Sequence, residues 1–132
     1  MPNEFKKVML IDDNEIDLKI NSRIISLGKH FDEIIICQSG EESLDYLNKY
    51  IDVPEKLPNF ILLDIQMPEM DGFEFLDHYK RLPKAFTSSC PVAMLSSTLD
   101  FGDIKRAEAN AYVVKLLKKP LLLTELASLI SK

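Results

Sequence analysis

The sequence of 132 residues places polar side chains directly after several short, mostly apolar runs; these side chains are Asp12 and Asp13, Asp64, Ser96, and Lys119. If the apolar runs are parallel strands of one sheet, their carboxyl ends share one edge, and open α/β folds bind ligands at that edge. Three carboxylates brought together repel one another, so burying them requires a countercharge. A hard divalent cation with oxygen ligands, such as Mg²⁺, meets this need, and Lys119 supplies a second positive charge.

This set of groups suits the transfer of a phosphoryl group to a carboxylate. Asp64 would be the nucleophile, while the metal and Lys119 would stabilise the charge on the phosphoryl oxygens. A hydroxyl at Ser96 can donate a hydrogen bond to an oxygen of the bound anion. The product would be an aspartyl phosphate at Asp64.

Capping of a turn or helix is the alternative for each polar residue taken singly, because Asp and Ser are good caps. An isolated Asp64 after a strand would be interpreted in that way, and so would the pair Asp12 and Asp13. For Ser96 the alternative is also capping, and Ser97, Thr98 and Asp100 compete for that role. The convergence of these residues on one sheet edge favours an acidic site over separate caps.

Two lysines compete for the position after the last strand. Lys115 follows Tyr112-Val113-Val114 but precedes Leu116, and it lies 19 residues after Ser96. Lys119 precedes Pro120 and lies 23 residues after Ser96, which leaves room for a full helix and strand. We therefore assign the lysine of the site to Lys119, with a solvated surface lysine as its alternative.

Buried strands and helices alternate along the whole chain. Strands are predicted at residues 6–11, 31–37, 60–64, 92–95 and 112–118, and helices at 14–27, 39–49, 72–82, 100–110 and from after Pro120 to the C-terminus. Crossovers of this length imply parallel pairing with helices on both faces. The prediction is one doubly wound α/β domain with a five-stranded parallel sheet, spanning residues 1–132.

Two of the helices carry an apolar periodicity that predicts a buried face. In the first, this face is Ile16, Ile20, Ile24 and Leu27, and Gly28 is the expected end of the helix. In the helix at 72–82 the face is Phe73, Leu76 and Tyr79, and Pro83 closes the helix. Glu69 and Asp71, in the preceding loop, are interpreted as solvated acids.

Composition excludes several classes of function. A formal net charge of -5 argues against a sequence-independent grip on nucleic acid, because such a grip is made by basic side chains. Cys37 and Cys90 lack a metal-binding or redox spacing and are predicted to be buried thiols. His30 and His78 are isolated and are expected to be surface or boundary residues. No apolar run is long enough for a membrane span or signal peptide, so a cytoplasmic protein is expected.

The chain resembles the receiver domain of two-component response regulators over essentially its full length. The matching segments are Met9-Leu10-Ile11-Asp12-Asp13-Asn14, Leu63-Asp64-Ile65-Gln66-Met67-Pro68-Glu69-Met70-Asp71-Gly72, Pro91-Val92-Ala93-Met94-Leu95-Ser96-Ser97 and Lys119-Pro120. Each segment is a weak signal alone, but the four in this order at the strand ends are specific.

The resemblance implies a flavodoxin-like receiver fold with strand order 2-1-3-4-5 and a role for each residue of the site. Asp64 would be the phosphoacceptor, Ser96 the hydroxyl that follows the phosphoryl group, and Lys119 its ion-pair partner, with a cis peptide to Pro120. Mg²⁺ would be held by Asp13 directly, by Asp12 mainly through water, by Asp64, and by the backbone carbonyl of Gln66. The side chains of Gln66 and Thr98 would line the path of attacking water.

The resemblance also implies partners and an output surface. The phosphoryl donor would be a histidine kinase or histidine phosphotransfer protein, and phosphorylation would switch the face formed by the helix at 100–110, the strand at 112–118 and the last helix. The downstream protein is unknown, and neither direct nucleic-acid binding nor a membrane is expected. Leu116 stands where the family often has an aromatic residue, so the usual hydroxyl–aromatic switch is not expected in that form; Tyr112 is too early in the sequence.

The sequence leaves other functions open. A receiver-like docking module that acts without phosphorylation is one, although the site residues are all chemically suitable. A phosphohydrolase with an aspartyl-phosphate intermediate is another, but such enzymes usually carry Asp-x-Asp, and the second residue after Asp64 is Gln66. A flavodoxin-type cofactor pocket is disfavoured because the loop after the first strand is acidic. The chain is thus expected to promote only its own phosphorylation and dephosphorylation, without being an enzyme in the usual sense.

Overall fold

The computed structural model describes residues 7–130 and shows strands and helices alternating along the chain. The strands are β1 (Lys7–Ile11), β2 (Glu33–Cys37), β3 (Phe60–Asp64), β4 (Val92–Ser96) and β5 (Val113–Lys118). The helices are α1 (Glu15–Gly28), α2 (Gly40–Lys49), α3 (Gly72–Tyr79), α4 (Lys84–Thr87), α5 (Phe101–Ala109) and α6 (Leu123–Ile130), with a 3-10 turn at Pro54–Lys56. The predicted start of the first strand at residue 6 and the end of the last helix at 131–132 lie outside the described residues.

The five strands form one parallel sheet in the order β2-β1-β3-β4-β5. This arrangement confirms the predicted fold class and strand order. The central strand β3 is buried at every position, as its uninterrupted apolar run requires. Because all strands point the same way, the residues that follow β1, β3, β4 and β5 meet at one edge.

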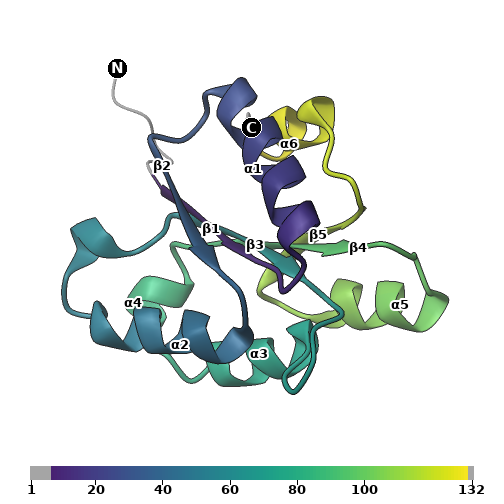
Figure 1. Cartoon of the computed structure of the whole chain (residues 1–132). Helices are drawn as coiled ribbons and strands as arrows, with labels where there is room; N and C mark the ends of the chain where they lie inside the picture. The colour runs from purple at the N-terminus through teal and green to yellow at the C-terminus, as the bar shows by residue number, and fades with distance from the viewer. Residues whose placement is uncertain (1–6, 131–132) are drawn as a thin grey trace.

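Helices cover both faces of the sheet (Figure 1). Helices α1 and α6 lie side by side on one face, where Leu18, Ile25 and Leu126 pack on β-strand residues such as Leu62. Helices α2, α3, α4 and α5 cover the other face, where Phe75 and Tyr79 belong to the larger of two apolar clusters. The carboxyl ends of the strands therefore lie between two layers of helices, one packed on each face of the sheet.

The predicted buried face of α1 is wrong at three of its four positions, since only Ile24 is half-buried and packs against the core. Ile16, Ile20 and Leu27 are 68%, 43% and 57% exposed, whereas Leu18, Asn21 and Ile25 are buried. Both sets of residues have helical spacing, so periodicity shows that the segment is a helix but leaves its rotation undecided. The rotation that the structure adopts turns Asp17 and Asn21 toward the chain segment after β5. Gly28 ends the helix as expected, but the left-handed residue after it is Lys29, with φ 56°.

The segment after α3 differs from the sequence prediction. Helix α3 ends at Tyr79 instead of residue 82, and the short helix α4 follows Pro83. The predicted apolar face is confirmed, since Phe73, Leu76 and Tyr79 are all buried. Phe86 of α4 packs edge-on against Tyr79 with 5.8 Å between ring centroids. A four-residue helix anchored by one aromatic side chain leaves no periodic signal in the sequence.

Other predictions about single residues have mixed outcomes. Cys37 and Cys90 are buried free thiols, as expected, and burial raises the pKa of Cys37 to about 11. Asp71, interpreted as a solvated loop acid, is instead the N-cap of α3 and forms a reciprocal capping box with Glu74.

Within residues 7–130 no helix has both the length and the apolar character needed to cross a membrane.

Candidate functional site

Asp64 lies at the carboxyl end of β3, where the backbone is packed tightly against the start of α3. Its side chain is 4% exposed. The backbone N–H of Gly72 donates to the carbonyl of Ile65 over 2.8 Å, and a Cβ at Gly72 would lie 2.7 Å from the carbonyl oxygen of Asp64. The Asp71-Gly72 pair therefore caps α3 and fixes the turn that begins at Asp64.

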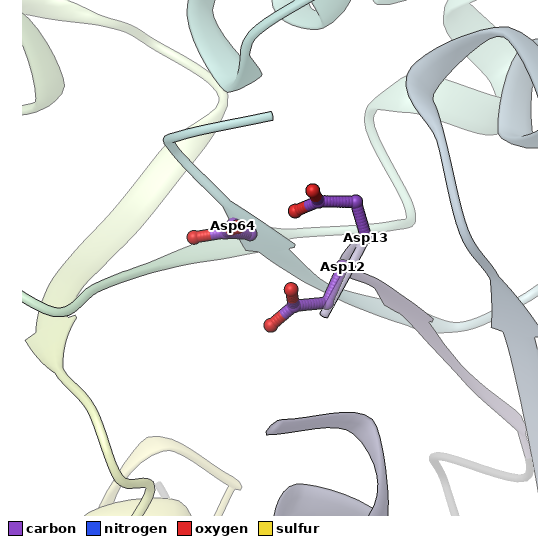
Figure 2. Close-up of side chains that lie close together, drawn as sticks. All are labelled: Asp12, Asp13 and Asp64. Carbon is purple, nitrogen blue, oxygen red and sulfur yellow. The ribbon is translucent and has the colours of Figure 1, made fainter. Parts of the chain in front are cut away.

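Asp12 and Asp13 follow β1 and meet Asp64 at the shared edge. One ligand oxygen from each of the three carboxylates lies within 4.8 Å of the others. Figure 2 shows the three side chains gathered at the strand ends. Asp12 is buried and Asp13 is exposed, so the cluster opens to solvent on the Asp13 side. The structure thus brings together the carboxylates that the sequence predicted to meet.

Lys119 lies among these carboxylates, with its side chain 10% exposed. Its Nζ lies 2.9 Å from Oδ2 of Asp12 and 3.0 Å from Oδ1 of Asp64. The peptide bond to Pro120 is cis, as the resemblance implied. These contacts assign the lysine of the site to Lys119 and exclude Lys115, which is exposed on β5.

The electrostatics of the site reflect burial and crowded charge. Burial and the neighbouring Asp12 raise the pKa of Asp64 from 3.8 to about 6, although Lys119 and a hydrogen bond from the backbone of Gln66 oppose the shift. Burial alone would lower the pKa of Lys119, but Asp12, Asp17 and Asp64 raise it above its ordinary value. The ammonium is therefore charged at any physiological pH.

The residues present fit a hard divalent cation. Carboxylate oxygens are the ligands that Mg²⁺ and Mn²⁺ prefer, and three of them converge here. Oδ2 of Asp12 is buried, and its contact with Lys119 is a close ion pair without a well-aligned hydrogen bond. This oxygen keeps an unused lone pair that a cation can take.

Ser96 is at the same edge, but its hydroxyl points into its own loop. The side chain is buried, donates a hydrogen bond to the carbonyl oxygen of Thr98 and accepts one from the N–H of Thr98 over 3.2 Å. A hydroxyl that follows a phosphoryl group would have to exchange these local bonds for an anion oxygen. Gln66 and Thr98 have exposed side chains, which leaves both accessible to solvent water.

Two residues of α1 that the sequence interpretation missed join the site. Asp17 Oδ2 accepts a hydrogen bond from Nζ of Lys119 over 3.0 Å, and its side chain is 32% exposed. One turn later, Oδ1 of the buried Asn21 accepts from the N–H of Leu121 over 3.3 Å. Polar residues four apart on a helix share one face, so a polar stripe at 17 and 21 was the available signal.

Leu116 stands at the position where the resemblance would place an aromatic residue. Leu116 is half-buried and lines a groove of about 330 Å³ between α5 and β5 together with Leu99 and Ile104. Tyr112 packs edge-on against Tyr79, with 5.6 Å between ring centroids. Tyr112 is thus held in the layer that covers the opposite sheet face from α1.

Comparison with known families identifies the class of protein. The family model described as "Response regulator receiver domain" matches residues 8–131. The chain belongs to this family. Among curated relatives, a probable methanogenesis regulatory protein from Methanothrix harundinacea is 30% identical over 114 residues, which are 86% of this chain and 72% of that protein. Histidine kinase CKI1 from Arabidopsis thaliana is 31% identical over 99 residues, 69% of this chain but 9% of the kinase.

Solved structures agree with the family assignment. A two-component response regulator from Cytophaga hutchinsonii has a TM-score of 0.88 and 33% sequence identity, covering 95% of this chain and 93% of that one. The Mn²⁺-bound form of the response regulator Rcp1 has a TM-score of 0.71 and 26% identity, covering 95% of this chain and 88% of that one. The fold, the acidic edge and the family membership therefore point to two-component signalling.

Proposed function

We propose that this chain accepts a phosphoryl group on Asp64 from a phosphohistidine of a partner protein, with Mg²⁺ as the metal. The observation that carries the proposal is the position of Lys119, whose ammonium lies between Asp12 and Asp64 at the edge where three carboxylates converge. Membership of the receiver family supports it, and histidine kinases among the relatives support the kind of partner.

In the proposed reaction an Oδ oxygen of Asp64 attacks phosphorus, and the bond from phosphorus to the donor imidazole nitrogen breaks. The electron pair of that bond returns to the imidazole, which is left neutral after taking a proton from solvent. Asp64 must be ionised to attack, and with its pKa near 6 it is mostly ionised at neutral pH. Lys119 stays charged and offers N–H donors to the oxygens of the transferred group.

Mg²⁺ would be held by Asp12, Asp13 and Asp64, with the backbone carbonyl of Gln66 completing the protein ligands. When bound, it would supply positive charge to the oxygens of the phosphoryl group. The Mn²⁺-bound neighbour supports a divalent cation here without deciding its identity. Ser96 would release the backbone of Thr98 to donate its hydroxyl to a phosphoryl oxygen.

We propose that the signal leaves through α5, β5 and α6. These three elements form the face that the sequence predicted at residues 100–110, 112–118 and the last helix. The short helix α4, which was not predicted, shifts the numbering of the helices that follow it. The loop of Ser96 leads into α5, and Lys119 connects β5 to α6, so both groups that would contact the phosphoryl group lie at the base of this face. The chain would act as a stoichiometric switch in the cytoplasm, where kinase domains use ATP, and not as an enzyme with turnover.

The test is phosphorylation by acetyl phosphate and Mg²⁺, followed by the mass of the intact protein. Wild type is expected to gain one phosphoryl group, and Asp64→Asn to gain none. Asp45→Asn, an exposed acid on α2, is the matched control and should behave as wild type. Absence of added mass in wild type, or its persistence in Asp64→Asn, would refute the proposal.

A further inference from the structure

The residue that calls for an explanation beyond the phosphoacceptor site is Asp17, a third carboxylate on Lys119. An ammonium group has three N–H donors, and around Lys119 three carboxylates lie within 3.0 Å of Nζ. Nζ of Lys119 donates a hydrogen bond to Oδ2 of Asp17 over 3.0 Å, whereas Oδ2 of Asp12 lies in an ion pair with the same ammonium.

The placement of Asp17 is built into the fold. Helix α1 begins at the N-cap Asn14, whose side chain accepts from the N–H of Asp17 over 3.0 Å. One turn later the buried Asn21 accepts from the N–H of Leu121, which fixes α1 against the segment that follows Lys119. Asn14 and Asn21 flank Asp17 in the sequence, and neither contact uses the Asp17 side chain, so the placement of α1 next to Lys119 does not depend on that carboxylate.

A carboxylate in this position opposes a bound anion in two ways. The carboxylate accepts a hydrogen bond from one N–H of the Lys119 ammonium, and that N–H is then not available to an anion bound at Asp64. Its negative charge also repels that anion. Asp17 is only partly exposed, so solvent screens this charge incompletely. For a cation bound at Asp12, Asp13 and Asp64, the same negative charge is attractive.

We infer that Asp17 is a positioning residue that draws the ammonium of Lys119 toward α1 and so weakens the hold of the site on a phosphoryl group at Asp64. This inference rests on the proposed function and deepens it, because it assigns to one residue of α1 the tuning of the phosphorylated state. With Asp17 present, the site has a lower affinity for a phosphoryl group at Asp64 than Asp12, Asp64 and Lys119 would give without it.

The test measures two ligands of opposite charge on the same variants. Beryllium fluoride, a phosphoryl analogue, is titrated in saturating Mg²⁺, and Mg²⁺ is titrated alone. Asp17→Asn and Asp17→Ala are expected to bind beryllium fluoride about threefold to tenfold more tightly than wild type and Mg²⁺ somewhat more weakly. A structural defect would weaken both ligands, so shifts in opposite directions identify the electrostatic role.

Glu15→Gln is the matched control, since Glu15 is an exposed acid in the same first turn of α1. It removes the same charge away from Lys119 and should change either affinity by less than the Asp17 variants do. If wild type binds beryllium fluoride and both Asp17 variants bind it no more tightly than Glu15→Gln, the role of Asp17 is overturned and the proposed function stands. If wild type fails to bind beryllium fluoride in Mg²⁺, the proposed function itself is overturned, and the role of Asp17 with it.

Discussion

Nζ of Lys119 lies 3.0 Å from Oδ1 of Asp64, and this contact joins the segment after β5 to the end of β3 across the sheet edge. Both side chains are at least nine-tenths buried. The pair is therefore a partly desolvated ion pair, in which removal of one charge would leave the other buried without compensation. Because further acids surround Lys119, its ammonium also contributes to the stability of the fold.

Replacing Lys119 by Met should destabilise the metal-free protein. The variant leaves Asp12 and Asp64 buried without their countercharge, which we expect to lower the free energy of unfolding at neutral pH by about 2–4 kcal/mol. Added Mg²⁺ should recover part of the loss, because it restores positive charge to the same carboxylates. Urea denaturation with and without Mg²⁺ measures both effects, with the exposed Lys118→Met as control. Equal stability of the two variants in chelator would contradict the expectation.

The raised pKa of Asp64 predicts a pH dependence of stability. Burial, reinforced by Asp12, raises this pKa to about 6 in the folded chain from the ordinary 3.8, so the folded chain binds more protons than the unfolded chain between these values. The contribution of Asp64 to the free energy of unfolding should therefore fall as pH rises from about 4 to about 6, with a loss of roughly 3 kcal/mol that persists at neutral pH.

Asp64→Asn isolates this contribution. In buffer with a chelator, the variant should be more stable than wild type at neutral pH, and the difference should shrink as pH falls toward 4. Denaturation by urea at several pH values gives the difference directly. Asp45→Asn serves as control because Asp45 is exposed. A difference that is constant over this pH range would show that titration of Asp64 does not link to folding.

Much of this fold could be read from the sequence, because the parallel sheet leaves a direct signature. Phe60–Leu63 is a continuous apolar run, as a strand buried on both faces requires, and parallel pairing brings its end to the end of β1. The meeting of Asp12, Asp13 and Asp64 follows from that topology alone. Lys119 could be chosen over Lys115 because the spacing from Ser96 leaves room for both a helix and a strand.

The rotation of α1 and the direction of the Ser96 hydroxyl could not be read in the same way. Apolar residues occur on two faces of α1, and tertiary contacts of Leu18 and Ile25 with the sheet decide which one is buried. Asp17 was missed for the same reason, since its role appears only once that rotation is known. A hydroxyl rotates freely, so the bond from Ser96 to the carbonyl of Thr98 depends on local loop geometry that spacing does not encode.

Gly72→Ala should disturb the loop that follows Asp64. A Cβ there would approach the backbone oxygen of Asp64 to 2.7 Å and the Cα of Ile65 to 3.1 Å, and neither backbone atom can move without shifting the end of β3. We expect a loss of about 1–3 kcal/mol in unfolding free energy and weaker phosphorylation by acetyl phosphate. Gly102→Ala is the control, because the atom nearest to its Cβ is a side-chain oxygen of Asp100. Thermal unfolding that ranks Gly102→Ala as the more damaging change would contradict this account.

The exposed apolar face of α1 offers a test of how a donor protein reaches Asp64. Ile20 is 43% exposed and lines a pocket of about 270 Å³ with Asp17, Lys119 and Pro120, so it borders the site next to Lys119. A protein that delivers a phosphoryl group to Asp64 must cover this border, whereas acetyl phosphate is small enough to enter without touching it. Ile20→Lys should therefore slow transfer from a phosphorylated histidine phosphotransfer protein at least about fivefold, since a desolvated lysine in an apolar contact is unfavourable. Its phosphorylation by acetyl phosphate should stay close to wild type.

Val114→Lys, at an apolar position on β5 that is 52% exposed, is the matched control and should leave both reactions unchanged. Equal slowing of the two donors by Ile20→Lys would place its effect on the chemistry of the site instead of on docking.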